Sequence, residues 1–283
     1  MSIIKYYKYQ GSIDEISSRY HAFAKLKNAK LKKASNRKWE NIDDGSISYQ
    51  ALTVFVGKTG YGKSSTVNAF LGNSIMKTSD IAACTRECQS LDFKLSPGCY
   101  FSLGDLPGIG ESEYRDKEYL KMYRDFLGLS TAIVYLLRAD TRDYSIDQAA
   151  YQQLFTTHAD KKKIILALNY CDKIEPISRN LSIEPSLLQM QNINQKVESV
   201  SSIFRPVNKI IPYSAVTGWN MNKLADAIVS VVSDSDELVS SIIEKIMPKD
   251  VPMGRKECKK CGNVEFTKYL NCPRCHNSGK WWL

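Results

Sequence analysis

The sequence has no hydrophobic run that approaches the roughly 20 residues of a membrane-spanning helix. Its longest continuous apolar stretch of strand character, at residues 131–137, is far shorter. The opening residues, MSIIKYYKYQ, contain neither the apolar core nor the cleavage site of a signal peptide, and no lipidation motif is found. From these absences we expect a cytoplasmic protein without a transmembrane segment.

Glycine and proline are also scarce, with 15 and 9 residues in a chain of 283, and we find no internal repeat. Hydrophobic residues make up 43% of the chain and charged residues 24%. This composition excludes the collagen-like, low-complexity and disordered classes. The length predicts one large domain together with something smaller.

The net charge of +9 is concentrated at the two ends of the chain. Residues 1–45 carry 10 basic and 5 acidic side chains, residues 245–283 carry 9 and 3, and the segment between them carries 20 and 22. Basic flanks of this kind favour an anionic partner, either RNA or a ribosome, or a peripheral contact with a membrane surface. The alternative is a solvated lysine-rich surface that has no partner.

Strand-like and helical segments alternate through the centre of the chain. The strand-like segments are 51–56, 89–95, 99–103, 131–137, 163–168 and 207–212, with a hairpin turn at 96–98. The helical segments are 12–34, one starting near 63, 114–127, 145–157, 186–204 and 221–232. The pattern predicts an α/β fold with a mostly parallel sheet. We divide the chain into a basic helical extension (1–45), the α/β domain (46–233), a helix or linker (234–256) and a C-terminal module (257–283).

One glycine-rich segment carries a phosphate-binding motif. Residues 57–64 read GKTGYGKS, which matches GxxxxGK[ST], and they lie between an apolar strand and a helix. Glycines allow the tight turn, backbone N–H groups face the phosphate oxygens, and the helix N-terminus adds partial positive charge. Lys63 is predicted to reach the β- and γ-phosphates, and Ser64 to bind Mg²⁺. The predicted phosphate-binding residues are Gly57, Lys58, Thr59, Gly60, Tyr61, Gly62, Lys63, Ser64 and Ser65.

Two further segments are predicted to respond to the γ-phosphate. Residues 105–108 read DLPG and end a strand, so we expect Asp105 to hold Mg²⁺ and the Gly108 N–H to sense the phosphate. Thr85, in the loop before the second strand, is expected to close on Mg²⁺ and the γ-phosphate. Lys63, Thr85 and Gly108 are therefore the predicted catalytic groups.

The base is predicted to be guanine. Residues 169–173 read NYCDK after a buried strand, and Asp172 is placed to accept hydrogen bonds from the N1–H and 2-amino groups, which adenine lacks. Asn169 and Lys173 complete this segment. The backbone N–H groups at Ser214 and Ala215 follow the next strand, where we expect one of them to meet the guanine oxygen.

Taken together, these segments resemble the P-loop GTPases of the Era/TrmE-like group, the bacterial ribosome-binding GTPases. Residues 50–233 carry the resemblance, through Thr85-Arg86 and the segments 105–108, 138–140 and 172–173. It implies the three-layer P-loop GTPase fold and slow, Mg²⁺-dependent hydrolysis of GTP to GDP and phosphate. It also implies a switch that reports the bound nucleotide to a partner, which we expect to be a ribosome, RNA or protein.

Three positions depart from that group. Tyr170 replaces the usual Lys over the base, where its ring can stack instead. Ile109 replaces a Gln that orients the attacking water, so hydrolysis needs another group, a water held by the backbone, or a partner. Arg86 and Arg142 either neutralise charge in the transition state or are ordinary surface residues. Gly60 replaces the Asn of potassium-activated members, so we predict no potassium activation. The alternative to a ribosome-associated GTPase is a GTP-sensing interaction scaffold, for example in phage or stress defence, with little turnover.

The C-terminal module contains a doubled cysteine motif. Cys258, Cys261, Cys272 and Cys275 form CxxC…CxxC, and the segment between the pairs is long enough for a β-hairpin at 263–271. The motif resembles a zinc ribbon with four thiolate ligands, with His276 as a competing ligand. A redox pair or two disulfides are the alternatives. The other cysteines show no pairing pattern, and Trp281 and Trp282 form an apolar tip that either packs internally or anchors a partner.

Overall fold

The computed structural model describes residues 7–27, 37–40, 47–76, 89–96, 99–110, 112–177, 183–234, 255–258, 264–266 and 281–282. Within these ranges an 8-stranded sheet forms the centre of the molecule. Its strands are β1 (Tyr7–Ser12), β2 (Arg37–Glu40), β3 (Ile47–Gly57), β4 (Gln89–Ser96), β5 (Cys99–Asp105), β6 (Ala132–Arg138), β7 (Ile164–Asn169) and β8 (Ile211–Pro212).

The strand order is β1-β4-β5-β3-β6-β7-β8, and β2 pairs with β3 off this path. The β4–β5 hairpin and the β2–β3 pair are antiparallel, and the remaining pairs are parallel. On one edge of β3, β2 pairs with residues 47–50 and β6 with 53–57, so the two strands share that edge. The predicted α/β fold with a mostly parallel sheet is confirmed.

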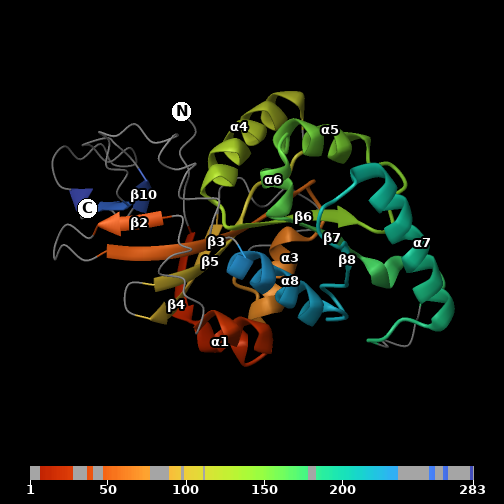
Figure 1. Ribbon diagram of the computed structural model, residues 1–283, viewed down its shortest axis with the longest axis horizontal. Helices are drawn as coiled ribbons and strands as arrows, with labels where there is room; N and C mark the ends of the chain where they lie inside the picture. The colour runs from red at the N-terminus through yellow and green to blue at the C-terminus, as the bar shows by residue number, and fades with distance from the viewer. Residues whose placement is uncertain are drawn as a thin grey trace.

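Helices cover both faces of the sheet, as Figure 1 shows, with α4 and α5 on one side and α1, α3 and α8 on the other. The helices are α1 (Ile13–Ser17), η1 (His21–Lys27, a 3₁₀ helix), α3 (Lys63–Leu71), α4 (Glu113–Leu129), α5 (Ser145–Leu154), α6 (His158–Lys162), η2 (Cys171–Lys173, a 3₁₀ turn), α7 (Leu187–Phe204) and α8 (Met221–Asp234).

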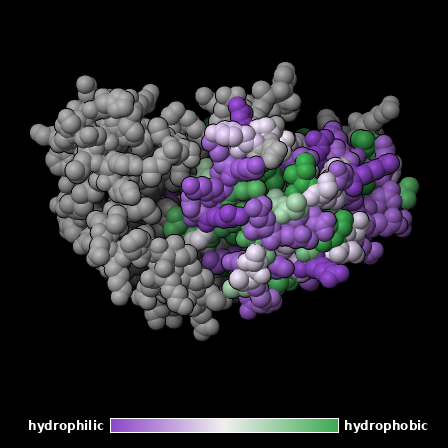
Figure 2. Space-filling view, turned by 90° about the horizontal axis from the view of Figure 1, so that it is seen from above, coloured by the Kyte–Doolittle hydropathy of each residue, from purple (hydrophilic) through white to green (hydrophobic). Residues whose placement is uncertain are grey.

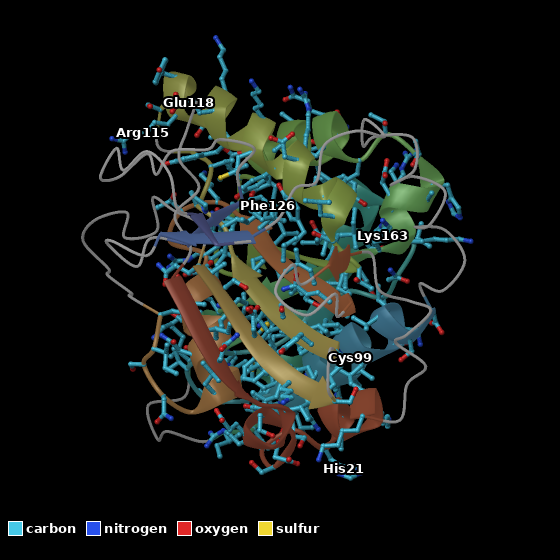
Figure 3. All side chains as sticks on the ribbon, turned by 90° about the vertical axis from the view of Figure 1, so that its left-hand side faces the viewer. His21, Cys99, Arg115, Glu118, Phe126 and Lys163 are labelled. Carbon is cyan, nitrogen blue, oxygen red and sulfur yellow. The ribbon has the colours of Figure 1, made fainter. Side chains whose placement is uncertain are left out.

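The central strands are buried on both faces, which explains their continuous apolar sequence. In β6, Val134 and Leu136 face the core beneath α3 and α8, whereas Tyr135 and Leu137 face the core beneath α4 and α5. Figure 3 shows side chains filling both sides of the sheet, with Phe126 of α4 on one side and His21 of η1 on the other. The predicted three-layer arrangement is therefore present.

The outer surface of the α4 and α5 layer is mainly hydrophilic, with scattered apolar residues (Figure 2). Arg115 and Glu118, near the start of α4, project outward from this layer (Figure 3). Within the described residues, no helix is both long and apolar enough to cross a membrane.

The single helix predicted over residues 12–34 is wrong. The chain instead forms β1, then α1, then η1, and residues 28–34 lie outside the described residues. Ser12 does cap α1, because its side chain accepts from the Asp14 N–H at 3.2 Å while Glu15 accepts from the Ser12 N–H at 3.0 Å. The helix then ends at consecutive serines, and the Ser18 hydroxyl donates to the Glu15 carbonyl at 3.0 Å, a local bond that competes with the helix.

The described part of the predicted N-terminal extension packs into the same core as the α/β domain. β1 runs parallel to β4 at the edge of the sheet. Phe23 of η1 is fully buried and meets Phe70 of α3 edge to face, with 5.4 Å between ring centroids. The chain does not continue as one helix after Ser17, and Phe23, in η1, therefore lies in this core.

Near the C-terminus, β9 (Arg255–Cys258), β10 (Val264–Phe266) and β11 (Trp281–Trp282) form a three-stranded antiparallel sheet in the order β10-β9-β11. Within the hairpin predicted at 263–271 the structure describes only β10, which pairs with β9; the other residues of that segment lie outside the described ranges. Cys261, Cys272 and Cys275 lie outside the described residues. Of the other cysteines, Cys99 and Cys171 are buried free thiols.

Candidate functional site

The glycine-rich loop joins β3 to α3, as its motif predicts. Gly57 ends the strand with φ +142°, and Gly62 precedes the helix with φ +84°. A Cβ on Gly57 would lie 2.6 Å from the Leu136 carbonyl oxygen, and one on Gly62 would lie 2.5 Å from the Asn169 Nδ2 atom. Both positions therefore need glycine for their backbone conformation and for space.

Lys63 is the first residue of α3, directly after this loop, and is largely buried. Its ammonium group donates to the carbonyl oxygens of Gly57 and Lys58 at 3.2 and 3.1 Å. The loop is thus wrapped around a positive charge at the N-terminus of α3, where backbone N–H groups also accumulate. This arrangement suits a bound polyphosphate.

Two hard oxygen ligands converge beside the loop. Asp105, at the end of β5 and fully buried, accepts a hydrogen bond from the Ser64 hydroxyl at 2.5 Å. β3 and β5 are parallel neighbours, so the ends of the two strands bring these side chains together. A carboxylate and a hydroxyl meeting at one point fit Mg²⁺, which prefers oxygen ligands. The third predicted ligand, Thr85, lies outside the described residues, as does Arg86.

The segment after Asp105 is hydrogen-bonded to the phosphate loop. Thr59 N–H donates to the Ile109 carbonyl at 2.9 Å, and Ile109 N–H donates to the Gly57 carbonyl at 3.3 Å. A Cβ on Gly108 would lie 2.5 Å from the Thr59 nitrogen, so only glycine allows this close approach. Gly108 and Ile109 are thus in direct contact with the loop that surrounds the Lys63 ammonium group.

Ile109 is 1% exposed and belongs to the apolar core beneath α4 and α5. Its side chain has no polar atom and points away from water. The position therefore supplies no group for orienting an attacking water, as the sequence predicted.

Asn169 links the phosphate loop to the predicted base-binding segments. Its Nδ2 group donates to the Tyr61 carbonyl at 3.1 Å, and its Oδ1 atom accepts from the Ala215 N–H at 3.1 Å. It is buried at the end of β7, next to Gly62. One amide thus fixes the spacing between the loop at 57–62 and the loop at 214–215.

Asp172 lies in η2, which begins two residues after the end of β7. Its Oδ1 atom accepts from the Ser214 hydroxyl at 2.7 Å, and Lys173 Nζ lies 3.7 Å from its Oδ2 atom. The Asp172 side chain remains 16% exposed, so a ligand can reach it. Hydrogen bonds therefore connect the phosphate loop to Asp105 and to Asn169, Asn169 to Ala215, and Asp172 to Ser214.

Sequence reasoning missed one carboxylate, Asp147, in the first turn of α5. It is fully buried and accepts from the hydroxyl of Tyr61, in the phosphate loop, at 2.9 Å. Burial raises the pKa of Asp147 to about 6, and the Tyr61 hydrogen bond opposes that shift. An acid in a first helical turn is usually a solvated partner of the helix dipole, so no local signal distinguished this one.

Replacing Asp147 by asparagine should stabilise the nucleotide-free protein at pH 8 by about 1–3 kcal/mol. The pKa in the folded state exceeds the ordinary 3.8, so the stability that this group contributes is present at low pH and is lost as the pH rises through about 6. Asparagine keeps an acceptor for Tyr61 but carries no buried charge. Urea unfolding at pH 4 and pH 8 measures the effect.

The expected gain is absent at pH 4, where the carboxyl is protonated in the folded state. Asp125→Asn, at an exposed position on α4, is the matched control and should change little at either pH. Equal destabilisation of Asp147→Asn at both pH values would contradict the assignment of a buried charge.

Comparison with known proteins finds one matching family model and several proteins of similar sequence. The family model described as "50S ribosome-binding GTPase" matches residues 52–170. YkfA of Escherichia coli, described as uncharacterized, is 34% identical over 202 residues, which cover 71% of this chain and 68% of YkfA. GTPase Era of Geotalea daltonii is 25% identical over 213 residues, which cover 72% of this chain and 64% of that protein.

Solved structures share the fold. A crystal structure of Era in complex with MgGDPNP and a segment of 16S ribosomal RNA superimposes with a TM-score of 0.52. It is 22% identical to this chain, and the match covers 65% of this chain and 57% of that one. At that identity the likeness concerns the fold of the α/β domain alone.

Proposed function

The chain belongs to the P-loop GTPases of the Era and 50S ribosome-binding group, and we propose that it acts there as a slow nucleotide-dependent switch on a ribosome or RNA partner. As a member of this family it binds GTP and hydrolyses it. The observation that carries the proposal is the hydrogen bonding between the segment at 107–109 and the phosphate loop. A change at the phosphates is thereby passed to the chain that leads into α4.

In this proposal each residue has a defined part. Lys63 and the backbone of residues 57–65 hold the phosphates, and Ser64, Asp105 and Thr85 hold Mg²⁺. When bound, the ion neutralises charge on the β- and γ-phosphate oxygens. Gly108 N–H senses the γ-phosphate.

The base-binding residues complete the site. Asp172 accepts from the guanine N–H groups, and Lys173 remains beside that carboxylate. A backbone N–H at Ser214 or Ala215 meets the guanine oxygen. Asn169 holds this part of the site at a fixed distance from the phosphate loop.

Slow turnover follows from Ile109. The residue after Gly108 is apolar and packed into the core, so the chain offers no side chain there to orient water. Hydrolysis then depends on a group supplied by a partner or by another part of the chain. The same observation favours a second candidate, a GTP-sensing scaffold that binds nucleotide and partner with little turnover.

The basic termini and the cysteine motif also have a role in this proposal, as the part of the chain that contacts the partner. Four cysteines, Cys258, Cys261, Cys272 and Cys275, bind one Zn²⁺ and shape a module that contacts the anionic partner. The spacing of the pairs supports this, and so does the antiparallel pairing of β9, which ends at Cys258, with β10. Among the described residues no cluster of three or more His, Cys, Asp or Glu side chains is placed to hold a metal, and three of the four cysteines lie outside them.

Single-turnover GTP hydrolysis by the full chain, with and without ribosomes, tests the proposal. We expect slow hydrolysis alone and an increase on the order of 10-fold or more with ribosomes or ribosomal RNA, because a partner supplies what Ile109 lacks. A variant with Cys272→Ser and Cys275→Ser should lose bound zinc by elemental analysis and lose the increase. Nucleotide binding without stimulation by either partner would favour the scaffold.

A further inference from the structure

Tyr170 is held across the gap between the base-binding segment and the phosphate loop. Its backbone has φ +65°, a left-handed conformation that bulky residues rarely adopt. The phenol hydroxyl donates to the Gly60 carbonyl at 3.2 Å, and the ring edge lies 3.5 Å from where a Cβ on Gly62 would stand. The ring therefore forms a half-buried wall beside the loop.

Arg138 covers one face of that ring. Its guanidinium carbon lies 4.2 Å from the centroid of the Tyr170 ring, a cation–π geometry. Arg138 ends β6, and β6 and β7 pair in a register that sets it beside Asn169, the residue before Tyr170. The stack thus joins the ends of two neighbouring strands.

Asp140 fixes the orientation of the guanidinium. Arg138 Nε and Nη2 donate to the two Asp140 carboxylate oxygens at 2.6 and 2.8 Å. This fork holds the guanidinium plane in place and leaves its face for the ring. Asp140, Arg138, Tyr170 and Gly60 therefore form a chain of contacts that ends on the phosphate loop.

We propose that Arg138 is a positioning residue for nucleotide recognition, which acts by holding the Tyr170 ring so that its other face packs against the purine next to Asp172. The proposal rests on the nucleotide site described above and adds to it the element that replaces the usual Lys. A tyrosine fixed at its hydroxyl and on one face loses little further freedom when a base stacks on it. The Gly60 contact couples base stacking to the phosphate loop.

The proposal separates the role of Arg138 from that of Asp172. A ring face stacks on any purine, whereas a carboxylate distinguishes guanine from adenine by hydrogen bonds. Loss of Arg138 should therefore weaken GDP and GTP alike and leave the preference for guanine over adenine unchanged. It should also leave the affinity for inorganic tripolyphosphate unchanged, because that ligand has no base.

Calorimetric titration of the full chain with GDP and Mg²⁺ tests this. We expect Arg138→Met to weaken GDP binding about five-fold, as loss of a partly exposed cation–π contact predicts. Arg138→Lys, which keeps the cation, should retain most of the affinity. Lys121→Met removes an exposed positive charge from α4, outside the site, and is the control, with no expected change.

A double-mutant cycle shows whether Arg138 acts through Tyr170. In a Tyr170→Leu background, Arg138→Met should cause no further loss, because no ring remains to be positioned. Asp140→Asn weakens the hydrogen bonds that orient the guanidinium but keeps Arg138, and it is the second variant. In the chain that retains Tyr170, it should cause part of the loss of GDP affinity that Arg138→Met causes.

Three results would overturn the inference: unchanged GDP affinity in Arg138→Met, equal losses in the two backgrounds, or an equal loss of tripolyphosphate affinity. The last would indicate a merely structural role. Failure of the unaltered chain to bind GDP at all would instead overturn the nucleotide site itself, and the inference with it.

Discussion

Replacing Lys63 by alanine should lower the affinity for GTP and GDP by about 100-fold and abolish measurable hydrolysis, since charged hydrogen bonds to phosphate contribute about 1.5–3 kcal/mol each. The ammonium lies inside the glycine-rich loop and bonds to the carbonyls of Gly57 and Lys58. A polyphosphate placed in the loop would take over these donors. Without them, the backbone N–H groups face the phosphate charge alone.

Titration calorimetry with GDP and Mg²⁺, together with phosphate release under single-turnover conditions, measures the loss. Lys121→Ala, at an exposed position on α4, is the control and should bind nucleotide like the unaltered chain. Thermal unfolding should show that Lys63→Ala keeps its fold. Retained nucleotide binding and hydrolysis in a folded Lys63→Ala protein would place the phosphate site elsewhere.

Replacing Asp172 by asparagine should change the preferred base from guanine to xanthine. The carboxylate offers two acceptors to the guanine N1–H and 2-amino groups, whereas an amide offers one acceptor and one donor. Xanthine carries a carbonyl oxygen where guanine carries the amino group, so the amide donor then has a partner. We expect GDP affinity to fall on the order of 100-fold, because one lost bond leaves a polar group unpaired.

Competition between GDP, xanthosine diphosphate and ADP for one fluorescent nucleotide measures the preference directly. Ser214 can still donate to the oxygen that remains at position 172, so the loop at 214–215 should keep its place. Asp125→Asn again serves as a control for the loss of one negative charge. An unchanged order of the three nucleotides would refute the assignment of Asp172 to the base.

The elements that the sequence predicted well are those whose signal is local. The β3–loop–α3 unit follows from consecutive residues, because glycine positions, an apolar strand and a helix start all lie within one short segment. The continuously apolar segment Thr131–Leu137 predicts a strand buried on both faces, and β6 occupies that place. In each case the sequence pattern that predicts the element lies entirely within the residues that form it.

The N-terminal region was predicted less well for a related reason. The spacing of Ile13, Ile16, Tyr20 and Phe23 suits a helix, yet the same apolar residues also serve a short helix followed by a turn. The contact between Phe23 and Phe70 decides between the two, and it joins residues far apart in the chain. Tertiary packing here overrides the local periodicity.

The sequence by itself determined the phosphate loop, the order of the site segments along the chain and the apolar Ile109, because each of these depends only on residues that are neighbours in the chain. Only the tertiary structure decided that Tyr61 meets the buried Asp147 and that Arg138 covers Tyr170. Tyr61 and Asp147 are 86 positions apart, and Tyr170 and Gly60 are 110 apart. Such contacts leave no periodic signal, because strand order in the folded sheet, and not spacing in the chain, brings the residues together.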